Sequence, residues 1–150
     1  MAISRGAGTE IIRFAHFADV DADADRNLLI GEQHHIYTIL SIIIYCNALN
    51  ATTDCCFLRS NFYDTITGAQ VEATIFMANP QPGETYVWND KFSFGGSLPT
   101  DFGSPPLSTV AEQDAIADQG DSTAQFLHLY CTHASDDYDV NITYIDQNNE

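Results

Sequence analysis

The chain has few basic residues. Only 5 lysines and arginines stand against 21 aspartates and glutamates among its 150 residues, which gives a formal charge of −16 at pH 7. Surfaces that bind phosphates need clustered lysine and arginine, because these side chains displace the counterions of nucleic acids and anionic lipids. The composition therefore excludes direct DNA or RNA binding as the expected function, and it argues against docking on an anionic membrane.

Long apolar runs are also missing. No stretch reaches the roughly 20 apolar residues that a membrane-spanning helix needs. The opening segment, residues 1–9, lacks the apolar centre of a signal peptide. We therefore predict a chain without a membrane span that is made and assembled in a reducing cytoplasm.

Catalytic signatures are absent from the sequence. It contains no nucleophile elbow, phosphate loop, dinucleotide-binding glycine pattern or zinc-binding His-Glu pattern. Cys131 and His133 could share one strand face, but side chains two residues apart on a strand stand apart, and no third group orients them. The adjacent His34 and His35 would point to opposite faces. We predict no enzyme activity, no catalytic residues and no bound cofactor, with calcium as the one candidate ligand.

The sequence has four cysteines: Cys46, Cys55, Cys56 and Cys131. Three of them lie in apolar, strand-like runs, where a free thiol behaves as a small hydrophobic side chain. Cys55 and Cys56 would point to opposite faces of a strand, so they cannot easily serve one site. Buried, reduced thiols are the prediction, with a disulfide or a metal site as the alternatives.

The central element is predicted at His34–Cys46, which contains no glycine, proline or acidic residue. Its β-branched and aromatic residues favour a strand. Apolar residues occupy both phases of the alternation: Ile36, Leu40, Ile42 and Ile44 on one face, Ile39 and Ile43 on the other. Such a strand either has cover on both faces or changes its partner part-way along.

Further strands are predicted on both sides of this segment. They are expected at residues 9–17, 28–30, 55–63, 71–78, 84–94 (one or two strands, hinged at Asn89 and Asp90), 125–133 and 138–145. A short helix is predicted at 109–119, because Thr109 and Glu112 have capping-box spacing and Gly120 is a stop signal. The last two strands are joined by residues 134–137, which is short enough for a hairpin.

These elements predict an all-β protein: an antiparallel β-sandwich, jelly-roll-like, with 7 to 9 strands and one short helix. The predicted organisation is a flexible arm at 1–8, one domain at 9–146 and a polar tail at 147–150. In the last strand, Tyr138, Val140, Ile142 and Tyr144 are expected to face one way.

The sharpest local signal is an acidic loop. Asp21, Asp23 and Asp25 have the spacing of the first ligands of an EF-hand-type calcium loop, and Glu32 falls at its last position. Arg26, however, stands where that loop needs a glycine. A calcium-like site at these four residues is one hypothesis, and a solvated acidic loop is the other.

An aromatic segment follows the Asn-Pro-Gln-Pro-Gly turn at residues 79–83. It contains Tyr86, Phe92, Phe94 and the only tryptophan, Trp88. These four residues are candidates for a subunit interface. The alternatives are an aromatic core layer beneath a strand pair and a platform on which sugars stack.

Several stretches together resemble small structural proteins of tailed bacteriophages from aquatic bacteria. They are MAISRGAGTEIIR (1–13), GEQHHIYT (31–38), WNDKFSF (88–94), QDAIADQG (113–120) and YIDQNN (144–149). The resemblance implies a virion component, above all a capsid decoration (cement) protein of jelly-roll type. Such proteins often form trimers that brace the shell, so the implied partners are the major capsid protein or other virion proteins and further copies of the chain. The implied location is the virion, assembled in the host bacterial cytoplasm. A tail, neck or fibre component and a carbohydrate- or receptor-binding sandwich are the alternatives.

Overall fold

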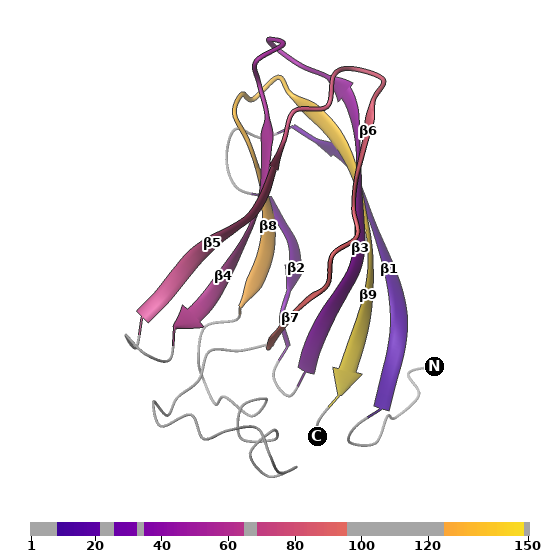
Figure 1. Cartoon of the computed structure of the whole chain (residues 1–150), viewed down its shortest axis with the longest axis vertical. Helices are drawn as coiled ribbons and strands as arrows, with labels where there is room; N and C mark the ends of the chain where they lie inside the picture. The colour runs from indigo at the N-terminus through magenta and orange to yellow at the C-terminus, as the bar shows by residue number, and fades with distance from the viewer. Residues whose placement is uncertain (1–8, 22–25, 33–34, 65–68, 96–124, 149–150) are drawn as a thin grey trace.

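The computed structural model describes residues 9–21, 26–32, 35–64, 69–95 and 125–148, and every regular element in these ranges is a strand (Figure 1). The strands are β1 (Thr9–Val20), β2 (Arg26–Ile30), β3 (His35–Ala48), β4 (Cys56–Asp64), β5 (Ala69–Ala78), β6 (Thr85–Trp88), β7 (Phe92–Gly95), β8 (Phe126–Cys131) and β9 (Asp137–Asn148). These bounds follow the predicted strands closely. The described ranges contain no helix with the length and hydrophobicity needed to cross a bilayer.

The strands form two antiparallel sheets. Sheet A has the order β1-β9-β3-β6, with β7 also paired to β3, and sheet B has the order β2-β8-β4-β5. The chain passes from one sheet to the other at every connection except β4–β5 and β6–β7 (Figure 1). With β6 and β7 taken as two parts of one strand, this is the connectivity of an eight-stranded jelly roll. The predicted all-β sandwich is confirmed. The predicted hairpin at residues 134–137 is wrong, because β8 and β9 lie in different sheets.

Strand β3 carries a β-bulge, which explains why its apolar residues occupy both phases of the alternation. Ile39 pairs with Tyr144 and Ser41 pairs with Thr143, so Leu40 is an extra residue without its own partner on β9. Two residues opposite one shift the alternation by one position. Ile39 therefore faces the same core as Ile42, although the predicted alternation placed them on opposite faces. The strand also changes partner, since β7 pairs with residues 36–39 and β6 with residues 42–45.

Strand β9 lies in the middle of sheet A, between β1 and β3. Its residues alternate as predicted: Tyr138, Val140 and Ile142 are fully buried, and the residues between them are partly exposed. The strand runs to Asn148, two residues into the segment predicted as a tail. The core between the sheets is dominated by large buried side chains from both sheets: Ile39, Ile42, Ile44, Leu58, Leu127, Leu129, Tyr138, Val140 and Ile142.

Two predicted segments lie outside the described residues. These are the arm at 1–8 and the helix at 109–119.

Candidate functional site

The predicted calcium loop is divided by a strand. Asp21 lies just after β1 and is exposed, whereas Glu32 follows β2. The five residues of β2 between them span about 13 Å at a strand's rise per residue. The carboxylate of Glu32 is instead 3.9 Å from Nε2 of His35. Asp21 and Glu32 therefore do not form one cation site, and Asp23 and Asp25 lie outside the described residues.

A different group of carboxylates does come together. One oxygen each from Asp19, Asp137 and Asp139 lies within 4.8 Å of the others, where the end of β1 meets the start of β9. Asp19 has a positive φ of 53°, and its carbonyl oxygen accepts a hydrogen bond of 2.9 Å from Arg26. Sequence spacing could not reveal this group, because β1 and β9 are far apart in the chain. Three carboxylates fall short of the six to eight oxygen ligands that calcium takes, so the group carries no metal assignment.

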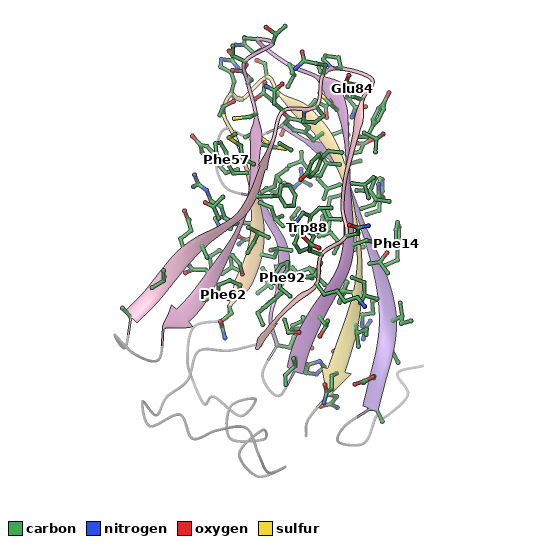
Figure 2. All side chains as sticks on the ribbon, in the orientation of Figure 1. Phe14, Phe57, Phe62, Glu84, Trp88 and Phe92 are labelled. Atoms are coloured by element: carbon green, nitrogen blue, oxygen red, sulfur yellow. The ribbon has the colours of Figure 1, made fainter. Side chains whose placement is uncertain are left out.

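The predicted interface aromatics face inward. Phe94 is 4% exposed and its ring lies 5.4 Å from that of Tyr37, while Trp88 lies 5.5 Å from Phe92. Trp88 and Tyr86 both pack against Phe76 on the opposite sheet, and Figure 2 shows Trp88, Phe92 and Phe62 between the two sheets. A subunit interface at Tyr86, Trp88, Phe92 and Phe94 stays a prediction, although these side chains pack between the sheets. Their alternation places them in the aromatic core layer, which was one of the alternatives.

Several exposed apolar side chains lie on the outer face of sheet A, while others (Ile30, Val71 and Met77) lie on sheet B. Ile12 is 72% exposed, Phe14 65% and Val87 55%. Phe14 points away from the sandwich on the outer side of β1 (Figure 2). The strand registers place these residues in three neighbouring rows across the sheet. The rows are Ile12, Ile145, Thr38 and Ser93; Phe14, Thr143 and Ser41; and His16, Asn141, Ile43 and Val87.

This outer face of sheet A, defined by those three rows, contains no acidic residue. Carboxylates return only one row beyond it, at Glu10 on one end and Asp139 on the other. The rows cover on the order of 300 Å², given the usual spacing of strands and residues. In a chain with a formal charge of −16, this face has no carboxylate, and it carries five apolar side chains beside six polar ones. Exposed apolar side chains gathered on one face are a candidate interaction surface.

The inner face of sheet A carries a polar cluster near the start of β3. Asp146 is 3% exposed and accepts hydrogen bonds from Nε of Arg13 (2.7 Å) and Nδ1 of His35 (2.6 Å). The hydrogen bond to Asp146 raises the pKa of Arg13, and burial raises the pKa of Tyr37 to about 12. Since Arg13, His35 and Asp146 come from β1, β3 and β9, the cluster ties the three strands together. This is a structural role.

The remaining thiol and imidazole candidates are kept apart or buried. All four cysteines are free thiols, and Cys131 is fully buried whereas His133 lies beyond the end of β8. Burial raises the pKa of Cys46 to about 11 and that of Cys131 to about 12, so neither carries a reactive thiolate at neutral pH. His128 is 1% exposed, with Nε2 3.5 Å from Glu72. This arrangement agrees with the prediction of free thiols, three of which are buried.

The described chain is thus a β-sandwich of jelly-roll connectivity with exposed apolar side chains on the outer face of sheet A. No protein-family model matches it, and no curated protein matches it. Among solved structures it is similar to one described as "Bacillus endospore appendages form a novel family of disulfide-linked pili". The alignment covers 100% of this chain and 97% of that chain, with 11% sequence identity and a TM-score of 0.41. A TM-score of this size does not establish a shared fold.

Proposed function

We propose that this protein is a non-enzymatic structural component of a bacteriophage virion, and specifically a capsid decoration protein. It forms homo-oligomers, with a trimer expected, and braces the shell through contacts with the major capsid protein or other virion proteins. It is assembled in the host bacterial cytoplasm and resides in the virion. The sequence resemblance to phage structural proteins and the jelly-roll connectivity both support this function.

The observation that carries the proposal is the outer face of sheet A. Ile12 and Phe14 expose most of their side chains there, although they could have been polar without any change to the core. Exposed apolar side chains on a sheet suit a permanent contact between subunits, because burying them releases water. The face also lacks carboxylates, which indicates a partner that is itself acidic. A second copy of this chain meets that condition.

The carbohydrate-binding alternative receives less support from the side chains. Its main evidence was the aromatic pair Tyr86 and Trp88, and both pack against Phe76 inside the sandwich. A sugar-stacking platform needs exposed rings. A tail, neck or fibre location remains the second candidate within the virion class.

Solution mass, measured by light scattering after size exclusion, tests the homo-oligomer. We expect a stable oligomer of the 16.5 kDa chain whose mass does not change with calcium or EDTA. Phe14→Glu should convert it to monomer, because a carboxylate would enter the contact. Met77→Glu is the matched control, since Met77 is 61% exposed but lies on β5 of sheet B. A monomeric wild type, or equal loss of mass in both variants, would overturn the contact.

Location in the virion is tested separately by immunogold electron microscopy of the phage that encodes the chain. Label over the head supports the decoration protein, and label over the tail supports the second candidate. Absence of the protein from purified virions, confirmed by mass spectrometry, would overturn the virion assignment.

A further inference from the structure

Two of the four cysteines lie directly opposite each other in sheet B. Cys56 on β4 is the cross-strand partner of Cys131 on β8. Both side chains are fully buried, so both point from sheet B into the core. Side chains of directly opposite residues on one face are the closest neighbours that two strands offer.

The hydrogen-bond pattern brings this pair closer still. The next pair along the ladder is Cys55 with Thr132, and the backbone N–H of Thr132 donates to the carbonyl oxygen of Cys55 at 3.1 Å. Hydrogen-bonded and non-hydrogen-bonded pairs alternate along antiparallel strands. Cys56 and Cys131 therefore occupy a non-hydrogen-bonded position, where Cα atoms are about 4.5 Å apart. Disulfides span Cα separations of about 4.4–6.8 Å, so the backbone needs little movement.

The other two thiols lack such a directly opposite position. Cys55 precedes Cys56 on the chain, and its side chain leaves β4 on the opposite side. Cys46 belongs to β3 of sheet A. Packed sheets lie about 10 Å apart, which is too far for a bond to either cysteine of sheet B without a shift of the sheets.

We propose that Cys56 and Cys131 form an intrachain disulfide when the chain folds in the presence of a small disulfide oxidant such as oxidised glutathione. The thiolate of one cysteine attacks the oxidant and forms a mixed disulfide, with release of one reduced glutathione. The thiolate of the second cysteine attacks the protein sulfur of that mixed disulfide and releases the second glutathione. Two electrons pass to the oxidant, and the protons lost by the two cysteines are taken up by the two glutathione thiolates.

The bond has to form while the strands are still pairing. In the folded chain both thiols are shielded, and burial raises the pKa of Cys131 to about 12 and that of Cys56 further. The thiolate is the attacking species, so exchange in the folded state is slow. Once formed, the disulfide is shielded from reductants by the same burial.

The test is refolding of the reduced chain in oxidised glutathione, followed by alkylation under denaturing conditions and intact-mass measurement. We expect two of the four cysteines to resist alkylation and the unalkylated chain to lose about 2 Da. Tryptic peptides alone cannot identify the bond, because Cys46, Cys55 and Cys56 all lie between Arg26 and Arg59. Single-cysteine variants do so.

Cys56→Ala and Cys131→Ala should each abolish the protection, whereas Cys46→Ala and Cys55→Ala should keep it. Alanine is used because it fits a buried position, and circular dichroism confirms folding of each variant. Four alkylated cysteines in the refolded wild type would overturn the proposal. Protection that survives in Cys131→Ala would overturn it as well. If a variant fails to fold, the wild type is digested with a protease that cuts between Cys46 and Cys55, and fragmentation of the linked peptide between Cys55 and Cys56 in the mass spectrometer decides the pairing.

Discussion

The bulge at Leu40 allows a sharp test of how the sandwich selects the buried face of β3. Deletion of Leu40 removes the residue that has no partner of its own on β9. Ile39 and Ser41 then become neighbours on a regular strand, and both keep their present partners and faces. The deletion removes only one partly buried side chain and the extra twist of the bulge. We expect it to cost about 1–2 kcal/mol of unfolding free energy.

Deletion of Ile43, three positions away, has a different consequence although this side chain is 36% exposed. The strand can recover its register only by losing the bulge, which turns Ile42 outward and Ser41 inward. Ile42 is fully buried, so its exposure costs about 1.5–3 kcal/mol. Burial of an unpaired serine hydroxyl adds about 1–3 kcal/mol. We therefore expect the Ile43 deletion to cost at least about 3 kcal/mol, a large share of a typical domain's stability.

Urea unfolding monitored by the fluorescence of Trp88, the only tryptophan, measures both deletions, because that ring lies between the sheets. Leu40→Ala separates loss of the side chain from loss of the bulge. Equal unfolding free energies for the two deletions, or a larger loss for Leu40, would refute the bulge as the origin of the phase change.

Three further predictions concern the core, pH and calcium. Trp88→Ala should lower the unfolding free energy by about 2–4 kcal/mol, measured by circular dichroism, while Val87→Ala on the same strand should change it by less than about 0.5 kcal/mol; similar losses would contradict the inward orientation of Trp88. Tyr37 and Cys131 both have a folded-state pKa of about 12, above their ordinary values of 10.0 and 9.0, so the neutral forms stabilise the fold. That stability is complete below about pH 9 and is lost as pH rises toward 12, so the urea midpoint should fall across this range and a flat profile would count against their burial. The thermal midpoint should differ by less than about 1 °C between excess calcium and EDTA, and a larger rise with calcium would restore the calcium hypothesis.

The strands could be predicted because their local signals agree with their environment. Apolar and polar residues alternate cleanly in β9, which pairs with a strand on each side. The strand face that carries Tyr138, Val140 and Ile142 is therefore buried as expected. β3 could be located but its faces could not be assigned. The position of its bulge depends on pairing with Tyr144 and Thr143, which lie about a hundred residues away.

The candidate surface was beyond sequence reasoning for a related reason. Val87 and Trp88 alternate on a four-residue strand, and nothing in that short segment indicates which phase meets the opposite sheet. The interface was predicted at Trp88, yet the exposed apolar side chain of this strand is that of Val87. Phe14 was equally hard to assign, because β1 has apolar residues in both phases and only the pairing with β9 determines its outward side. Apolar residues on both sides of the strand, at Ile11, Ile12 and Phe14, were the one sequence signal that an apolar side chain would be exposed there.

The central place of β9 in sheet A has a consequence for biosynthesis. β9 is the strand that joins β1 to β3 in sheet A, yet it is the last of the described strands in chain order. Contacts between residues 9–20 and 137–148 join segments separated by more than a hundred positions, which is a slow route to a folded state. Until residues 137–148 have been synthesised, sheet A cannot be completed, and the strand edges of β1 and β3 that pair with β9 stay open to solvent. A chain that has not yet reached residue 137 is therefore the form most exposed to aggregation and to chaperones.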